Sequence, residues 1–337
     1  MSDAKQEVPP TDVLRHVRAQ RRRAAVPVTQ PLMLCSQIQR SGGTLLSRLF
    51  DGHPSCFAHP NELRWGRPKG WPSVPLHGAA DAVALFHELQ ESWPVRFARR
   101  GYVKDRQHVE ASGAEHAPLP FLFDPDLQFT IFQDALPATV ERQRDVLNAY
   151  LTSLFNAWLD YQHLYNAPKR WVTAFEPRFL ARRDGGPDAF FADYPDGLLV
   201  TIVREPVSWV ASYQRHVPER SLEKALRLWT DSLQAGVQAC ETHGNRVVLI
   251  MFDDLVHRTE AVMRRLCARM DIAFERSLLE PTFNSMPVLS NSSHAPAFGI
   301  DPVATTRGRL VPERTGHDPL LEDATVRYET VRARFAV

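Results

Sequence analysis

The chain has 337 residues, which is enough for one large α/β domain or two smaller ones. Apolar residues make up 44% and charged residues 23%, values typical of a globular enzyme with a sizeable core. The formal net charge is only +1, so no overall field attracts nucleic acid or anionic lipid, and an anion has to bind at a local site. The four cysteines lack a paired spacing, which favours reduced core thiols over a disulfide framework or a zinc site.

The first thirty residues are polar and include three consecutive arginines, residues 21–23. They contain no apolar stretch of signal-peptide length, and no later segment approaches the ~20 apolar residues of a membrane helix. We interpret the arginine run as a solvated helix face rather than a transit or nucleic-acid-binding tail. The sequence therefore predicts a polar N-terminal extension over residues 1–30, no membrane span, no nucleic-acid partner and a cytoplasmic location.

Short apolar runs alternate with helical patterns along the rest of the chain. The predicted strands cover residues 32–37, 55–59, 171–175, 197–203 and 246–252. The predicted helices cover residues 44–51, 138–165, 206–216, 222–241, 259–270 and 322–334. This alternation predicts a parallel sheet covered by helices on both faces. Residues 66–137 are rich in proline and resemble an irregular cap, so we expect a single domain over residues 31–337 that includes this cap.

A glycine turn follows the first predicted strand, in the stretch "LMLCSQIQRSGGTLLSRLF". Gly42 and Gly43 allow the backbone to approach an anion, and the first amides of the next helix point at it. Ser41 and Thr44 add hydroxyl donors, and Arg40 adds a guanidinium suited to a tetrahedral oxyanion. The phosphate-binding loop of nucleotide triphosphatases has the pattern G-x-x-x-x-G-K-[ST]. The loop in this sequence has neither that glycine spacing nor the lysine.

A second candidate phosphate site lies in "TIVREPVSWVASYQRH". Arg204 stands at the end of a buried strand, which places it at the carboxyl edge of the sheet, where open α/β folds bind ligands. Ser212 lies about two turns along the following helix and can face the same side. An arginine and a serine in this arrangement fit a second phosphate group, distinct from the first.

These motifs carry a resemblance to a known family. "QRSGGTLLSRLFDGHP" resembles the 5′-phosphosulfate loop of the sulfotransferases that use 3′-phosphoadenosine 5′-phosphosulfate (PAPS), and "VREPVSWVAS" resembles their 3′-phosphate motif. "FDDLV" and "PTFNSMPVLSNSSHA" also resemble later stretches of this family. The resemblance covers about residues 31–64 and 169–310. It implies a three-layer fold like that of the P-loop nucleotide triphosphatases, with a central parallel sheet flanked by helices and an irregular substrate cap.

The resemblance also implies site residues. The co-substrate would be held without a metal ion by the loop from Arg40 to Leu45 together with Arg204 and Ser212. Arg307 and Arg309, in "TTRGRL", either close over the nucleotide like the family's C-terminal basic loop or are simply solvated. One departure stands out. Many relatives have a Lys-x-Pro element before the 3′-phosphate strand, whereas Phe175 stands here at the lysine position; Lys169 and Arg178 are the candidate substitutes.

On the acceptor side, "HPNELRWG" matches the Glu-x-Arg pattern of the Golgi-type and tyrosylprotein branches. This match makes Glu62 the general base and adds Arg64, alongside Arg40, to the catalytic residues. The alternative for Glu62 is a surface carboxylate paired with Arg64. His59 is a local rival, because the cytosolic branch uses a histidine base, although a lone histidine near a strand end is more often structural.

The sequence therefore predicts a sulfotransferase that moves a sulfuryl group from PAPS to an acceptor hydroxyl. The acceptor would be a small molecule, a carbohydrate or a peptide. Two other functions stay open. A P-loop kinase of a small metabolite would need magnesium and ATP, and the missing lysine counts against it. A non-catalytic nucleotide-binding protein would bind PAPS without transferring the sulfuryl group.

Overall fold

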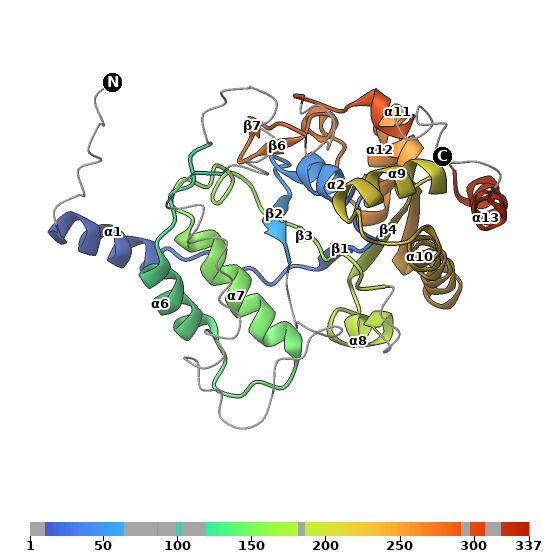
Figure 1. Ribbon diagram of the computed structural model, residues 1–337. Coiled ribbons are helices and arrows are strands. Elements are labelled where there is room, and N and C mark those ends of the chain that lie inside the picture. The colour runs from blue at the N-terminus through green and yellow to red at the C-terminus, as the bar shows by residue number, and fades with distance from the viewer. Residues whose placement is uncertain are drawn as a thin grey trace, which may run out of the picture.

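The computed structural model (Figure 1) describes residues 11–63, 86, 99, 101–102, 119–180, 186–290, 297–306 and 318–336. All statements below concern these residues. None of the described helices is long and apolar enough to span a membrane. The four cysteines all have free thiols, and three of them are buried, as the sequence predicted.

A parallel sheet of five strands forms the centre of the protein (Figure 1). In chain order the strands are β1 (Leu32–Cys35), β2 (Cys56–Glu62), β3 (Trp171–Phe175), β4 (Leu198–Val203) and β5 (Val247–Met251). Their order in the sheet is β2-β3-β1-β4-β5, so β1 pairs with β3 on one side and with β4 on the other. The predicted parallel sheet is therefore confirmed: β3 has the predicted bounds, and the ends of the other strands differ from the predicted ones by at most three residues.

Helices surround this sheet. They are α1 (Thr11–Arg23), α2 (Gly43–Phe50), α6 (Pro125–Ala135), α7 (Gln143–Ala157), α8 (Gly186–Asp193), α9 (Pro206–His216), α10 (Leu222–His243), α11 (Phe252–His257), α12 (Thr259–Met270) and α13 (Pro319–Phe335). A short hairpin follows α12, formed by β6 (Thr282–Phe283) and β7 (Met286–Pro287), and a 3-10 turn, η3, spans Pro302–Thr305.

The two faces of the sheet are covered by different sets of helices. Met33 and Cys35 of β1 pack into a core formed with α2, α11 and α12. Leu32 and Leu34, which alternate with them, pack into the opposite core with α6, α7 and α8. The ends of β4 and β5 on that opposite side contact α9, α10 and α13. The result is the three-layer arrangement that the sequence predicted.

Two predicted elements differ from the structure. Residues 125–135 fall within the predicted irregular cap but form α6, which begins at an Asp124 cap and packs against α7. The aromatic helix predicted for residues 138–165 is shorter, because α7 begins at Gln143 and ends at Ala157. The arginine run at 21–23, interpreted as a helix face, forms the last turn of α1, and Arg18 of this helix pairs with Asp124 of the α6 cap (2.7 Å).

Candidate functional site

Two glycines lie where the loop after β1 turns into α2. Gly42 has a left-handed backbone (φ 97°), and a β-carbon on it would lie 2.6 Å from the ring of Phe252. A β-carbon on Gly43 would lie 1.9 Å from the side-chain nitrogen of Gln37. Gly42 is therefore required by both its backbone conformation and the Phe252 ring, whereas a side chain at position 43 would displace the end of the Gln37 side chain. The turn brings the amino end of α2, where the helix dipole favours an anion, to the carboxyl edge of the central strand.

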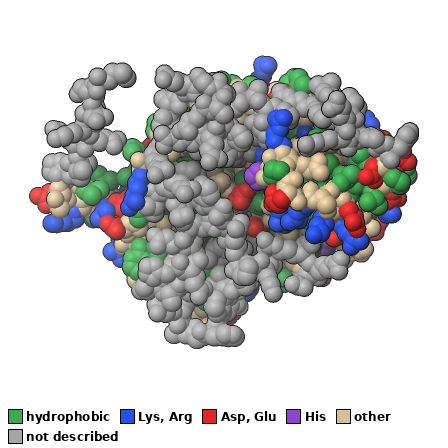
Figure 2. Space-filling view, in the orientation of Figure 1, with side chains coloured by type: hydrophobic (Ala, Val, Ile, Leu, Met, Phe, Trp, Pro, Cys, Tyr) green, Lys and Arg blue, Asp and Glu red, His purple; other side chains and the backbone are tan. Residues whose placement is uncertain are grey.

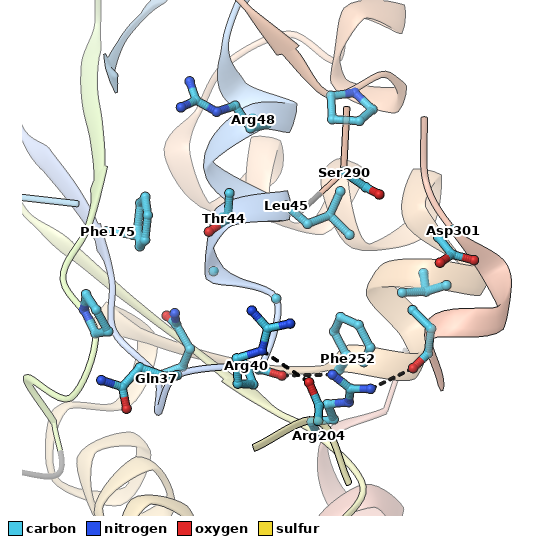
Figure 3. Close-up of a pocket in the computed structure, with 18 of the residues that line it drawn as sticks. Gln37, Arg40, Thr44, Leu45, Arg48, Phe175, Arg204, Phe252, Ser290 and Asp301 are labelled. Atoms are coloured by element: carbon cyan, nitrogen blue, oxygen red, sulfur yellow. Dashed lines mark hydrogen bonds between the residues drawn. The ribbon is translucent and has the colours of Figure 1, made fainter. Parts of the chain in front are cut away.

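Arg40 has a φ of 69°, in the left-handed region that most residues avoid. Arg204 donates a hydrogen bond to the carbonyl of Arg40 (2.9 Å), and Nε of Arg40 donates to the hydroxyl of Ser212 (3.1 Å). The indole of Trp209 donates to the carbonyl of Gln39 (2.8 Å). Figure 3 shows Arg40 directly above Arg204, joined to it through these bonds. The segment after β4 therefore holds the loop after β1 in its strained shape.

Arg204 follows β4 directly, and only 8% of its surface is exposed. Its guanidinium also donates to the hydroxyl of Ser208 (2.7 Å from Nη2) and to the carbonyl of Ala304 (2.6 Å). Burial, followed by the positive charge of Arg40, lowers the pKa of Arg204 to about 10. Two guanidinium groups this close raise the local positive potential, which an anion bound between the two motifs would relieve.

A cavity of about 290 Å³ opens at this edge of the sheet, and both motifs contribute to its wall (Figure 3). The residues from the first motif are Arg40, Gly42, Gly43, Thr44 and Leu45. Arg204 and Ser212 come from the second motif. Ser41 does not contribute to the wall: it is 1% exposed, and its hydroxyl makes no hydrogen bond within the described residues.

Glu62 lies in the wall of the same cavity. It is the last residue of β2, where the pairing of β2 with β3 shifts register between Ala58 and Glu62. Such a shift redirects the side chains that follow it, and both Asn61 and Glu62 line the cavity. Phe175, which pairs with Glu62 at the end of β3, forms the adjoining wall. One cavity thus combines the predicted base with both predicted phosphate motifs.

His59, the rival base, has a different environment. It is 5% exposed, it does not line the cavity, and its Nδ1 is hydrogen-bonded to the carbonyl of Asn61 (2.7 Å). Its Nε2 makes no hydrogen bond within the part of the chain that the structure describes. Burial lowers the pKa of His59 to about 4, and the nearby charge of Arg48 contributes to the shift. This arrangement fits a neutral histidine inside the core.

The buried state of His59 predicts a pH-dependent stability. Its folded pKa of about 4 lies below the ordinary value of 6.5, so between these values the unfolded chain binds more protons. We expect His59 to reduce the free energy of unfolding by ~3 kcal/mol as the pH falls from 6.5 towards 4. Urea unfolding at several pH values in this range gives the free energy of unfolding of wild type and of His59→Gln. This free energy should fall more steeply with decreasing pH in wild type than in the variant. Parallel curves for the two proteins would show that His59 is not buried in its neutral form.

Several predicted residues lie outside the described residues, namely Arg64, Arg307 and Arg309. The two candidate substitutes for the missing lysine do lie within them. Lys169 precedes β3, at the opposite edge of the sheet from the cavity, and donates to the carbonyl of Pro54 (2.7 Å). Arg178 follows β3, and its amide donates to the carbonyl of Gln37 (2.8 Å). It therefore contacts the loop after β1 but does not line the cavity.

Sequence reasoning missed part of the cavity wall. Gln37, Arg48 and Tyr102 line it, together with apolar residues that follow α12. The place of Arg48 could have been predicted from the sequence. It stands four residues after Thr44 on α2 and therefore lies on the same face of the helix. The place of Tyr102 could not, since it depends on the tertiary fold. No group of three or more potential metal ligands occurs within the described residues.

Comparisons with known proteins agree with this geometry. Residues 37–276 match the profile of a family described as the sulfotransferase family. The fold is similar to the sulfotransferase domain of the Synechococcus PCC 7002 olefin synthase, with a TM-score of 0.52 and 15% identity, covering 90% of this chain and 97% of that domain. It is also similar to the sulfotransferase domain of the curacin biosynthetic pathway, with a TM-score of 0.50 and 15% identity. This match covers 90% of this chain and 99% of that domain. A search of curated protein sequences found no significant match.

At these identities the solved structures bear on the fold alone, and they confirm the three-layer architecture that the resemblance implied. The profile match includes the first loop, the predicted base, and Arg204 with Ser212. It spans more than half of the chain. This protein is therefore an enzyme that belongs to the sulfotransferase family.

Proposed function

We propose that the sulfuryl donor is PAPS and that the acceptor is a hydroxyl group activated by Glu62. The observation that supports this most is the shared cavity, which brings together segments that follow three different strands. The loop after β1 and the segment after β4 supply positive charge and hydrogen-bond donors, and the end of β2 supplies a carboxylate. The cavity wall therefore has two parts with different chemistry. One part can bind anionic groups, and the other can accept a proton.

The anionic part fits the two phosphate groups of the nucleotide. The amides at the start of α2, the hydroxyl of Thr44 and the guanidinium of Arg40 would hold the 5′-phosphosulfate. Arg204 and Ser212 would hold the 3′-phosphate. Arg40 touches Ser212 directly, so the two anion sites adjoin. In this proposal Arg307 and Arg309 cover the nucleotide, which is one of the two alternatives stated for them above.

The reaction needs one proton acceptor and a site for the departing negative charge. The acceptor oxygen forms a bond to sulfur while the bond from sulfur to the 5′-phosphate oxygen breaks. Glu62 takes the proton of the acceptor hydroxyl, and Arg40 with the α2 amides stabilises the charge on the leaving phosphate. His59 is less suited to this task, because it lies outside the cavity wall. Arg64 keeps the catalytic role that the resemblance implies.

The donor can be tested by calorimetry with three nucleotides. Adenosine 3′,5′-bisphosphate, the product of the reaction, should bind roughly 10–150-fold more tightly than adenosine 5′-phosphate, since charged hydrogen bonds to the second phosphate contribute ~1.5–3 kcal/mol. ATP with magnesium should bind more weakly than the bisphosphate. Tighter binding of ATP with magnesium would favour a kinase instead. Bisphosphate binding without transfer of labelled sulfuryl to any acceptor would favour a non-catalytic protein.

A further inference from the structure

Arg48 is a buried cation on the acceptor side of the cavity. Only 4% of its surface is exposed, yet its side chain forms part of the cavity wall. Figure 3 shows it one turn above Thr44 on α2, on the same side as Phe175 and away from Arg40 and Arg204. It is therefore separate from the cluster that fits the phosphate groups of the nucleotide.

The surroundings of Arg48 leave its charge without a carboxylate partner. Its Nη2 donates to the carbonyl of Pro60 (2.5 Å) and to the hydroxyl of Tyr102 (2.6 Å). Its Cζ lies 4.7 Å and 5.0 Å from the ring centroids of Tyr102 and Phe283. Within the described residues, Nε and Nη1 make no hydrogen bond, and no Asp or Glu forms an ion pair with the guanidinium.

A buried charge that lacks an opposite charge is costly, so such groups in proteins are usually paired or bind a ligand. Carbonyl, hydroxyl and aromatic groups compensate part of this cost, but none of them carries a full negative charge. The position is informative as well. Arg48 donates a hydrogen bond to the carbonyl of Pro60, two residues before Glu62 on β2, so its side chain lies beside the strand that carries the proposed base.

We propose that Arg48 is a binding site for an anionic group on the acceptor. The acceptor then carries a carboxylate, sulfate or phosphate in addition to the hydroxyl that receives the sulfuryl group. This inference rests on the proposed function, because it takes the side of the cavity next to Glu62 as the acceptor side. It narrows the acceptor from any alcohol to an anionic alcohol or phenol, such as a hydroxy acid or an already charged sugar.

The test uses two acceptor-like compounds that differ only in charge, 4-hydroxyphenylacetate and its amide. The protein is first saturated with adenosine 3′,5′-bisphosphate, which occupies the phosphate sites, and each compound is then titrated by calorimetry. Wild type should bind the carboxylate at least ~10-fold more tightly than the amide, because a charged hydrogen bond contributes about this much. In Arg48→Gln the ratio should fall to about 1, while Arg48→Lys, which keeps the charge, should retain part of it.

Arg227→Gln is the matched control, because Arg227 is exposed on α10 and pairs with Glu223. It should keep the wild-type ratio. Equal affinities for the two compounds in wild type, no binding of either, or a ratio that survives Arg48→Gln would each overturn the proposal. If Arg48→Gln does not fold, wild type and Arg48→Lys decide the question. Failure of the proposed function is distinguishable, because it would appear in the first step as a lack of bisphosphate binding.

Discussion

Glu62→Gln is expected to lower the rate of sulfuryl transfer by ~10²–10⁴-fold while nucleotide affinity changes little. Glutamine keeps the shape of the side chain and its hydrogen bonding, but it cannot accept the proton of the acceptor hydroxyl. Glu62 lies at the end of β2 in the cavity wall and belongs to neither phosphate motif, so binding of the nucleotide should depend little on it. Glu62→Asp, which is one methylene shorter, should keep a fraction of the activity.

Single-turnover transfer from labelled PAPS measures this effect, because it separates the chemical step from product release. Glu223→Gln on the surface of α10 is a suitable control for the loss of a carboxylate. If Glu62 were only a surface carboxylate paired with Arg64, its neutralisation would cost ~0–1 kcal/mol and the variant would behave like wild type. A rate that is normal in Glu62→Gln but abolished in His59→Ala would instead identify His59 as the base.

Arg204→Ala and Ser212→Ala should both weaken nucleotide binding, but in different ways. Ser212→Ala removes one hydroxyl from the cavity wall, so it should lower affinity for adenosine 3′,5′-bisphosphate more than for adenosine 5′-phosphate. Arg204→Ala should have a larger effect, ~1.5–3 kcal/mol for the 3′-phosphate, because a charged hydrogen bond is lost. It also removes the donor to the carbonyl of Arg40, so some affinity for the 5′-phosphate should be lost as well.

Calorimetry with both nucleotides measures these differences, with Arg269→Ala on the exposed side of α12 as the control. Ser208→Ala adds a further comparison, since it removes a hydrogen-bond partner of Arg204 without taking a side chain from the cavity wall. Equal losses for the two nucleotides in Ser212→Ala would show that this residue does not contact the 3′-phosphate.

The central part of the fold could be predicted from the sequence because its signals are local. Each strand is a short apolar run that ends at a turn or at the start of a helix. The two glycines at 42 and 43 predict the loop after the first strand. Helix α6, in contrast, was not predicted. Its cap at Asp124 and its apolar Leu127 and Ile131 are helical signals. The surrounding sequence is rich in proline, however, and this composition led to the prediction of an irregular segment. For α7, the carboxylate of Asp145 accepts a hydrogen bond from the backbone N–H of Arg142 (3.0 Å), which sets a later start than the apolar pattern suggested.

The candidate site could be predicted in part for the same reason. Arg40, Thr44, Arg204 and Ser212 stand at fixed places beside strand ends, so the sequence alone indicates that they meet. The environments of other residues depend on partners that are distant in the chain. Arg48 contacts Tyr102, which is 54 residues away, and burial of His59 follows from packing against α7. No local pattern encodes such contacts, so the surroundings of Arg48 and His59 could be read only from the structure.

The hydrogen bond from Arg204 to the carbonyl of Arg40 links positions that are 164 residues apart in the chain. The conformation of the loop after β1 is therefore supported by a contact that exists only while β4 lies beside β1 in the sheet. The proposed nucleotide site is lost when the sheet unfolds. A nucleotide that binds there stabilises the whole chain against unfolding, by about 2.7 kcal/mol at a concentration one hundred times its Kd. Cellular supply of the nucleotide would then influence how long the enzyme survives proteolysis, as well as how fast it works.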